Sequence, residues 1–429
     1  MINALGLLKE RRFLPLFVTQ FLGAYNDNLF KTAMVLFATY QIFKDPATES
    51  NFNALATGLS LIPFFLLSAL SGQLADSYDK ARIIRLVKLA EIGIMIFGAA
   101  GLIIAKHGYV TPGIAMMLGA VLMLGVHSTF FGPIKYAILP QHLDEDQVLG
   151  GTGLVEAGTY LSILLGTVTA GWIGVEAAAV TVILVACVGL LAGRQVPPAP
   201  RAGAMLKINW NPFTASYALI RQTMHIRRLF LAICAISFFW TIGAVLIVIF
   251  PPLAKNVLTA DEKVASLMIA IFSIGVAIGS VIINSMLKSE ISAKYSPISV
   301  IGMALFVVAF SIESRLWIAA PPGQLYNVWD FVSHPQSLLV LGTLMAIATT
   351  GGMFVVPLYA FLTTTVTKDQ TARTVAANNV VNAGAMVIGA AAVIAITALG
   401  VGPADMLLVV AGMCLVSAWI ARQLHLACD

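Results

Sequence analysis

Residues 130–139 read FFGPIKYAIL, and residues 354–362 read FVVPLYAFL. The first run is followed by Asp146-Gln147 and by VEAG at 155–158. The second is followed by Asp369-Gln370 and by VNAG at 381–384. The two runs agree in order, and in spacing to within a few residues. The sequence therefore predicts two related halves that repeat one arrangement of helices in the same direction along the chain.

The composition indicates what surrounds these halves. Of the 429 residues, 59% are hydrophobic and only 10% are charged. A soluble domain carries roughly 25% charged residues, and a single buried core stops growing at about 250–300 residues. Neither an aqueous surface nor one core accounts for this chain, so lipid must contact most of its outside. The predicted fold class is an all-α polytopic membrane protein.

Twelve apolar segments are long enough to span a bilayer, which takes about 20 mostly apolar residues. They lie at 13–43, 53–75, 82–105, 112–137, 149–172, 175–193, 228–254, 264–287, 295–313, 335–358, 374–399 and 403–424. The first shows no signal-peptide cleavage site and is interpreted as a spanning helix. We predict an N-terminal six-helix half at 1–193, a cytoplasmic linker at 194–227 and a C-terminal six-helix half at 228–429.

The Lys and Arg residues are distributed unevenly between the two sides of these spans. With both termini inside, 19 fall on the inner side and 5 on the outer side, and Lys31 falls within the membrane. The inner residues are Lys9, Arg11, Arg12, Lys80, Arg82, Arg85, Lys88, Lys135, Arg194, Arg201, Lys207, Arg221, Arg227, Arg228, Lys288, Lys294, Lys368, Arg373 and Arg422. The outer residues are Lys44, Lys106, Lys255, Lys263 and Arg315. Because cytoplasmic loops carry the excess of Lys and Arg, both termini are predicted to be cytoplasmic. The net charge of +5 then requires no nucleic-acid partner.

The linker contains one predicted helix. Asn211-Pro212 is a good helix start, with Asn as the cap and Pro in the first turn. Phe213, Tyr217, Ile220 and Met224 then recur at helical spacing. This pattern fits a helix that lies at the cytoplasmic membrane surface, and a plain tether fits equally well.

Ionisable residues inside a membrane span are costly and usually functional. Asn26, Asp27 and Asn28 lie about halfway along the first span. Lys31 follows on the same helix face, where it could pair with Asp27. Three adjacent polar residues favour a wet, substrate-binding cavity. A self-satisfied structural pair is the alternative.

Four further residues are candidates for the same cavity. Glu156 lies in the fifth span, and its counterpart in the repeat is Asn382 in the eleventh, near Asn378. A structural hydrogen-bonding role fits the Asn residues as well as substrate contact does. Lys135, near the inner end of the fourth span, is either a phosphate-binding cation or a lysine whose ammonium reaches the interface.

Two more ionisable residues are expected to have structural roles, and the cysteines show no functional pattern. Glu91, near the middle of the third span, is expected to face another helix, and His127 favours core packing over a proton relay. The four cysteines show neither metal-ligand spacing nor a disulfide framework.

The loop after the second span reads GQLADSYDKAR at 72–82. With the duplicated six-span plan, this run resembles the cytoplasmic loop signature of the major facilitator superfamily, in which it latches the two halves. The resemblance implies a latch made of Gly72, Asp76, Lys80 and Arg82. Gly72 would allow close helix approach, and Asp76 would accept from helix N-terminal amides or pair with a basic residue. An ordinary charged turn is the alternative, since Ser77 and Asp79 replace the signature's Arg and Gly.

Three runs carry a narrower resemblance: QFLGAYNDN at 20–28, GPIKYAIL at 132–139 and GLVEA at 153–157. They resemble the bacterial lysophospholipid transporter (LplT) family and the related module that some bacteria fuse to a lysophospholipid acyltransferase. The resemblance covers essentially the whole chain. It implies import of lysophosphatidylethanolamine and lysophosphatidylglycerol from the outer to the inner leaflet of the bacterial cytoplasmic membrane for reacylation, with Asp27 as a headgroup residue. An Arg that the family can carry in the seventh span is absent, because residues 245–248 read VLIV.

The combined hypothesis is alternating access with sideways entrance of a single-chain lipid. Glycines of the fifth span, together with Gly275 and Gly279 of the eighth, would form a small-residue seam that opens to lipid. Asp27 or Glu156 would bind an ammonium group, and Lys31 or Lys135 a phosphate.

Two rival functions remain open at this point. One is a proton-coupled drug or metabolite exporter of the same fold, with Asp27 or Glu156 as the proton carrier. The other is a non-transporting partner that holds an acyltransferase at the membrane through the linker. The sequence shows no nucleophile–base constellation, metal-ligand cluster or phosphate-binding glycine loop, so neither a cofactor nor enzymatic activity is predicted. A monomer is expected.

Overall fold

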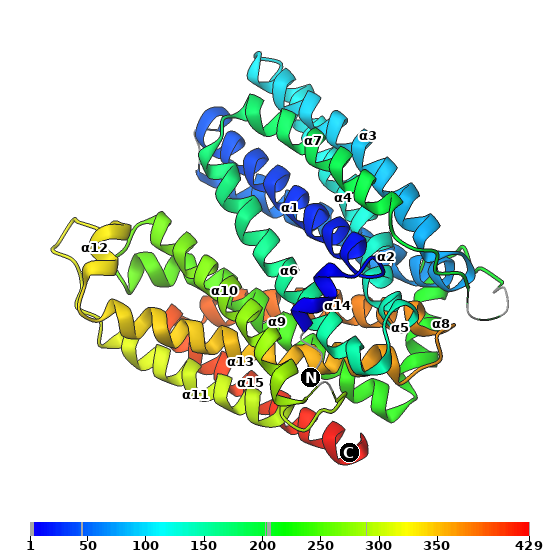
Figure 1. The fold of residues 1–429 in the computed structure, drawn as a ribbon. Coiled ribbons are helices and arrows are strands. Elements are labelled where there is room, and N and C mark those ends of the chain that lie inside the picture. Colours follow the sequence, from blue (N-terminus) through cyan, green and yellow to red (C-terminus); the bar gives the residue numbers. More distant parts are fainter. Residues whose placement is uncertain (1–3, 44–45, 202, 204–206, 289, 429) are drawn as a thin grey trace. The chain divides into compact units, whose positions relative to one another are not determined.

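The computed structural model of this protein describes residues 4–43, 46–201, 203, 207–288 and 290–428. Lys44, which the sequence places on the outer side, and the side chain of Cys428 lie outside this part. Within it the regular elements are all helical (Figure 1). The prediction of an all-α chain is confirmed.

The helices follow one another through short connections. A 3₁₀ turn, Ala4–Lys9, comes first, and a π turn, Ala38–Ile42, follows α1. The first eight α-helices are α1 (Leu14–Phe37), α2 (Pro46–Ser77), α3 (Lys80–Lys106), α4 (Val110–Ala137), α5 (Leu139–His142), α6 (Glu145–Trp172), α7 (Val175–Arg194) and α8 (Pro212–Met224). The others are α9 (Arg227–Asn256), α10 (Glu262–Met286), α11 (Ser296–Arg315), α12 (Val328–Ser333), α13 (Ser337–Thr364), α14 (Thr371–Ala398) and α15 (Pro403–Cys428).

Eleven helices of the described chain are long and apolar enough to cross a membrane. The twelfth predicted span is α1, which has 24 residues but carries Asn26, Asp27, Asn28 and Lys31 in its middle. These polar side chains lower its mean hydropathy, and its length still suffices for a bilayer at 1.5 Å per residue. The count of twelve is consistent with this structure.

Local sequence explains several helix starts. Asp79, which replaces the usual Gly of the loop signature, caps α3: its Oδ1 accepts from the amides of Ala81 at 2.8 Å and Arg82 at 3.2 Å. Asn211 caps α8 in the same way, because its Oδ1 accepts from Phe213 N at 3.0 Å. The helix predicted to start at Asn211-Pro212 therefore begins there.

The helices group into two compact units. Unit 1 comprises Met1–Thr223 and Thr363–Val380, and unit 2 comprises Met224–Leu362 and Val381–Asp429. The first turns of α14 thus belong to unit 1 and the rest of α14 to unit 2. The predicted boundaries at 193 and 227 follow the sequence repeat, whereas these units follow packing.

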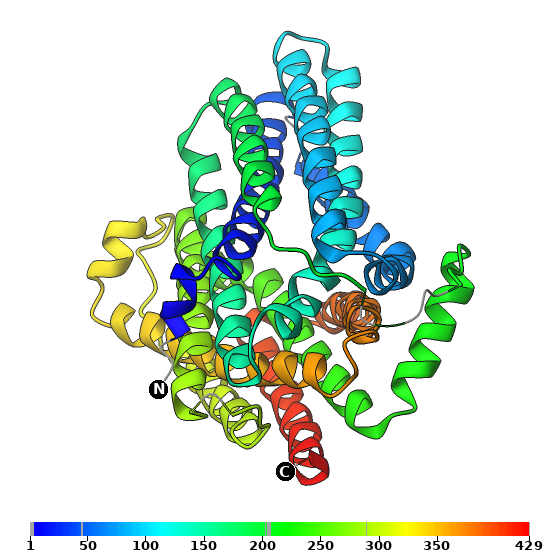
Figure 2. The ribbon, with the colours of Figure 1, turned by 45° about the vertical axis from the view of Figure 1, so that its right-hand side comes forward.

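In unit 1, α1 packs along α6 and α7, and α4 packs along α2 and α3 (Figures 1 and 2). Close packing of α6 on α1 depends on glycine, because a Cβ at Gly166 would lie 2.5 Å from the carbonyl oxygen of Tyr25. In unit 2, α15 packs against α9 and α11.

The glycines expected to line a lateral seam instead pack against neighbouring helices of their own unit. Gly158 and Gly166 of α6 face α1, and Gly275 and Gly279 of α10 face α13. At Gly279 a Cβ would collide with the carbonyl oxygen of Thr349. These small residues therefore bring helices of one unit together, and they do not support the predicted seam.

Candidate functional site

The polar residues in the middle of α1 point to different partners. Asp27 Oδ2 accepts a 2.7 Å hydrogen bond from Ser128 of α4, while Asp27 Oδ1 is buried without a hydrogen-bond partner. Asn28 donates to the carbonyl oxygen of Ala24 on its own helix at 2.8 Å. Asp27 Oδ1 and Asn26 Oδ1 are thus both buried acceptors without a partner, and of the two only Asp27 carries a charge.

The expected pairing of Asp27 with Lys31 is absent from the described part of the chain. Spacing along the helix makes such a pair possible, but the carboxylate of Asp27 engages α4 instead. Lys31 is half-buried, and its ammonium has no ion-pair partner among the described residues. Each of the two charges is thus available to a ligand.

Asn26 belongs to a fully buried polar network in unit 1. Its Nδ2 donates to Glu91 Oε1 on α3 and to the Val182 carbonyl on α7, both at 3.0 Å. Glu91 Oε2 also lies 2.5 Å from Lys88 Nζ and 3.3 Å from His127 Nε2. The amide nitrogen of Asn26 thus joins α1 to α3 and α7, while its Oδ1 is buried without a hydrogen-bond partner.

The expectation that the charge of Lys88 lies on the inner side is wrong. Its side chain is fully buried inside α3, where it pairs with Glu91 three residues later. Glycine makes room for it, because a Cβ at Gly23 would lie 2.7 Å from Lys88 Nζ. The Lys-x-x-Glu spacing in a predicted span was the signal that could have revealed this pair. His127, expected to pack in the core, contacts Glu91.

Lys135 and Glu156, predicted separately, belong to one cluster. Tyr136 donates a hydrogen bond to Glu156 Oε1, and Lys135 Nζ donates to Thr159 Oγ1 at 3.4 Å. Lys135 and Glu156 also attract each other electrostatically. Thr159 Oγ1 lies 3.0 Å from Gln20 Oε1 of α1. Gln20 and Thr159 are neutral polar residues that sequence reasoning missed.

The two asparagines of α14 fall in different units. Asn378 is fully buried in the part of α14 that belongs to unit 1. Asn382 lies in unit 2, where its Oδ1 accepts from Ser237 of α9 at 2.6 Å. Nearby, Trp240 Nε1 donates to Tyr359 Oη at 2.8 Å. Asn382 therefore has a structural partner of its own.

The loop signature forms a contact between α2 and the start of α14. Asp76 accepts from the amides of Ala372 and Arg373, each at 3.1 Å, and from Arg373 Nε at 2.9 Å. Amides at a helix N-terminus favour a carboxylate because they are unpaired and lie at the positive end of the helix dipole. Gly72 has to be small here, since a Cβ would lie 2.9 Å from Arg373 Cα.

Two predicted latch residues make no hydrogen bond in this contact, although Lys80 attracts Asp76 electrostatically. The ammonium of Lys80 is buried and makes no hydrogen bond among the described residues, and the Arg82 side chain is exposed. The basic partner of Asp76 is instead Arg373, which the sequence analysis counted only as an inner-side charge. Its distance along the chain conceals this pairing in the sequence.

The start of the linker packs on unit 1. Val196 accepts from Arg85 Nη2 at 3.2 Å, and Ala199 accepts from the amide of Lys80 at 3.0 Å. His142 Nε2 lies 3.4 Å from the Pro198 carbonyl. Burial lowers the pKa of His142, and the Pro198 carbonyl partly offsets this effect. The first residues of the linker are therefore anchored.

No group of three His, Cys, Asp or Glu side chains in the described chain could hold a metal ion. Cys187, Cys234 and Cys414 are free thiols. What the described residues offer in the spans is a set of charges and hydrogen-bonding groups suited to binding a polar or charged ligand.

Solved structures with the same fold are transporters. A bacterial homologue of the iron transporter ferroportin, in an outward-facing state, matches with a TM-score of 0.72 and 12% identity, over 97% of this chain and 99% of its own. The proton:xylose symporter XylE matches with a TM-score of 0.68 and 11% identity, over 97% of this chain and 95% of its own. At such low identity the likeness concerns the fold.

Several curated relatives are named lysophospholipid transporter LplT. The protein of Serratia proteamaculans (strain 568) is 27% identical over 83% of this chain and 80% of its own length. The protein of Cronobacter sakazakii (strain ATCC BAA-894) is 26% identical over 88% of this chain and 85% of its own length.

The family comparison covers most of the chain. The sequence profile of the Major Facilitator Superfamily matches residues 16–390, and the duplicated helical plan, the Asp76 loop and the similar solved structures agree with it. This chain belongs to the Major Facilitator Superfamily and is a membrane transporter, not an enzyme.

Proposed function

We propose that this protein moves lysophospholipids, such as lysophosphatidylethanolamine and lysophosphatidylglycerol, from the outer to the inner leaflet of the bacterial cytoplasmic membrane. Its relatives named LplT, similar over at least four fifths of both chains, support this substrate class. Both termini would be cytoplasmic, as the distribution of Lys and Arg predicts. An acyltransferase would then consume the imported lipid, and the transporter itself would act as a monomer.

The observation that carries the proposal is the unpaired oxygen of Asp27. Buried polar atoms in folded proteins nearly always have partners, so an acceptor left open in the middle of a span calls for a ligand. An ammonium group, such as that of an ethanolamine headgroup, would complete its hydrogen bonds. Ser128 holds the other oxygen and so fixes the direction in which the carboxylate points.

Lys31 is the first candidate for the lipid phosphate. It lies one helical turn from Asp27, roughly the separation of the two charges in a zwitterionic headgroup, and it has no ion-pair partner among the described residues. Lys135 and Glu156 would form a second site of the same kind, in which the two charges balance each other and Tyr136 donates a hydrogen bond to the carboxylate of Glu156. Asn28, Asn378 and Asn382 remain weaker candidates for substrate contact.

In this proposal the Asp76 contact works as the latch of alternating access. Gly72 and Asp76 join α2 to α14, and α14 itself belongs partly to each unit. Release of this contact would free α14 to move. Sideways entrance of the lipid stays part of the hypothesis, although the glycines first assigned to it pack elsewhere.

The test is transbilayer movement of labelled lysophosphatidylethanolamine in liposomes, with and without an imposed proton gradient. Asp27→Asn removes a charge-assisted contact of about 1.5–3 kcal/mol, so the initial rate should fall roughly tenfold to a hundredfold. Lys31→Gln should act in the same direction. Asp146→Asn is the matched control, because Asp146 is an exposed carboxylate in the first turn of α6.

Wild-type rates in both Asp27→Asn and Lys31→Gln, with normal insertion, would contradict this assignment. The competing function is a proton-coupled drug or metabolite exporter, which the same unpaired carboxylate favours as a proton carrier. Absence of lysophospholipid movement with and without the gradient would favour that exporter. Movement without any gradient, lost in Asp27→Asn, would favour facilitated flipping.

A further inference from the structure

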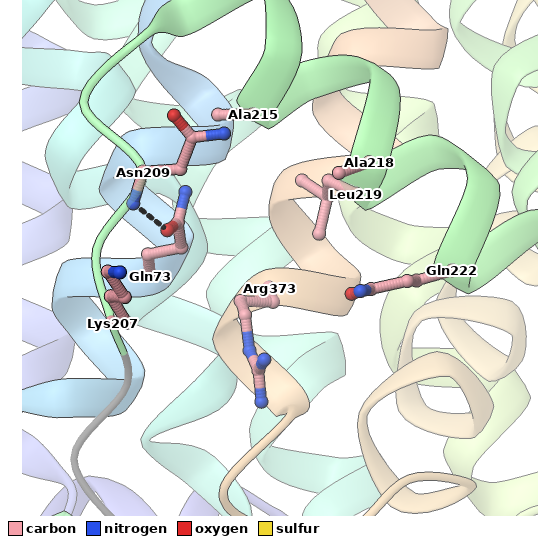
Figure 3. A pocket seen from close by; sticks show the side chains of 8 residues that line it. All are labelled: Gln73, Lys207, Asn209, Ala215, Ala218, Leu219, Gln222 and Arg373. Carbon is pink, nitrogen blue, oxygen red and sulfur yellow. Dashed lines mark hydrogen bonds between the residues drawn. The ribbon is translucent and has the colours of Figure 1, made fainter.

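A pocket of about 270 Å³ lies in unit 1, lined in part by Arg373 (Figure 3). Arg373 is the ion-pair partner of Asp76. Four segments supply its walls: the end of α2, the extended linker before α8, α8 itself and the start of α14. The lining residues are Gln73, Lys207, Asn209, Ala215, Ala218, Leu219, Gln222 and Arg373. The pocket is smaller than the roughly 300–1,000 Å³ that encloses a drug-sized ligand, so it suits a headgroup rather than a whole lipid.

The charge of the lining is positive. Two of the lining residues, Lys207 and Arg373, are cations, three are neutral amides, and none is a carboxylate. Lys207 is exposed and has no ion-pair partner among the described residues. An anion is the ligand that such a lining attracts.

Arg373 has donors to spare for this anion. Its Nε binds Asp76 at 2.9 Å, and its Nη2 donates to the Asp369 carbonyl at 3.1 Å. The Nη1 group makes no hydrogen bond within the described chain. Since a guanidinium offers five N–H donors, Arg373 can bind a phosphate oxygen without releasing Asp76.

The linker is already held at the rim of the pocket. Gln73 Oε1 accepts from the amide of Asn209 at 2.8 Å (Figure 3). Ala215 and Leu219, which lie one turn apart on α8, are both buried. This frame places Lys207 and Gln222 on separate segments around Arg373.

The opposite face of α8 indicates where the ligand comes from. Phe213 and Tyr217 on this face are 67% and 69% exposed, and Trp210, in the extended linker just before α8, is 68% exposed. Large aromatic side chains at helical spacing on an exposed face fit the headgroup region of a bilayer, where Trp and Tyr accumulate. Gln73 lies in the last turns of the span that ends at Ser77. The pocket therefore opens at the level of lipid headgroups.

We infer that this pocket binds the phosphate of an anionic phospholipid, with Lys207, Arg373 and Gln222 as its ligands. The bound lipid fastens the linker and α8 onto the Asp76–Arg373 contact. It is a site for a resident membrane lipid, separate from the transported substrate, and it needs no covalent step.

The experiment measures binding of fluorescent phosphatidylglycerol to the full-length protein in neutral detergent micelles. Lys207→Gln and Gln222→Ala should each weaken binding, about tenfold for the charge and about threefold for the amide. Lys288→Gln is the matched control, an exposed lysine that the sequence also places on the inner side. Inorganic phosphate and glycerol 3-phosphate, added as competitors, distinguish a free phosphate from a lipid.

Selective weakening in Lys207→Gln, with little competition from the two soluble phosphates at millimolar concentration, supports the inference. Equal effects of Lys207→Gln and Lys288→Gln overturn it, because attraction would then depend only on net charge. Full displacement by a soluble phosphate overturns the lipid assignment. Phosphatidylglycerol binding is measured without lysophospholipid transport, so failure of the proposed function leaves this test intact.

Discussion

The two units bury different chemistry at corresponding places. In unit 1, Tyr136 bonds the carboxylate of Glu156. At the repeated positions of unit 2, Tyr359 accepts from Trp240, and Asn382, the counterpart of Glu156, accepts from Ser237. At these corresponding positions, unit 1 therefore has a charged group, and unit 2 has neutral hydrogen bonds.

The contrast extends over the described parts of both units. The buried acidic, basic and histidine side chains in unit 1 are Asp76, Lys80, Lys88, Glu91, His127 and Glu156. In unit 2 the buried polar side chains are Ser, Thr and Asn. A charge in the membrane interior needs a partner, and unit 1 supplies partners for most of its charges. In the described parts, the buried charges are therefore concentrated in unit 1, whereas the buried polar groups of unit 2 are neutral.

The largest expected effect comes from breaking the buried pair of unit 1. Glu91→Gln or Lys88→Met leaves one buried charge uncompensated, which should cost about 3–5 kcal/mol of unfolding free energy. Ser237→Ala in unit 2 should cost only about 1 kcal/mol, the value of a neutral hydrogen bond. The unfolding free energies of all these variants can be measured in detergent, with the helical circular dichroism signal as the readout.

The double variant Lys88→Met with Glu91→Gln sharpens this comparison. Because neither charge is then left alone, it should be more stable than either single variant. Additive losses in the double variant would show that the two residues are not coupled.

The second effect comes from exchanging the corresponding residues. Asn382→Asp places a carboxylate in a neutral environment and should destabilise the protein by about 1–3 kcal/mol. The double variant Glu156→Gln with Lys135→Met keeps an acceptor for Tyr136 and leaves no charge alone, so it should change stability by less. Thermal unfolding of both variants in the same detergent gives the comparison. A larger loss in this double variant than in Asn382→Asp would contradict the neutral character assigned to unit 2.

The difference between the two units should be smaller for the two tyrosines. Tyr136→Phe removes a hydrogen bond to a charged group, worth about 1.5–3 kcal/mol, whereas Tyr359→Phe removes a neutral bond worth about 0.5–1.5 kcal/mol. Each variant keeps the ring and its packing. Unfolding midpoints should therefore fall further for Tyr136→Phe, and equal shifts would remove the distinction between the units.

The smallest effect concerns pH and the linker of unit 1. Burial lowers the pKa of His142 in the folded state, so the unfolded chain binds the proton more readily. The stability that this group contributes is present above its ordinary pKa of about 6.5 and is lost as pH falls through the lower, folded pKa. His142→Gln should reduce the loss of stability on acidification. Melting temperatures of the wild type and of His142→Gln, measured above and below pH about 6.5, give this loss of stability. If the two proteins lost the same stability on acidification, His142 would not be its cause.

The sequence by itself determined the class of protein and much of its plan. A span needs about 20 apolar residues because the bilayer core has a fixed thickness, so the segments could be counted directly. The repeat of FFGPIKYAIL and FVVPLYAFL indicated two related halves. A charged residue in a span is costly wherever it occurs, so Asp27 was recognisable without a structure.

Only the tertiary structure decided which residues meet. Lys88 looked like an inner-side charge, and burial between α3, α1 and α7 made it the partner of Glu91. Arg373, rather than Lys80 or Arg82, became the partner of Asp76, and Gly275 and Gly279 turned toward α13. Spacing along one helix specifies which residues share a face. The helix that covers that face is set by packing between segments far apart in the chain.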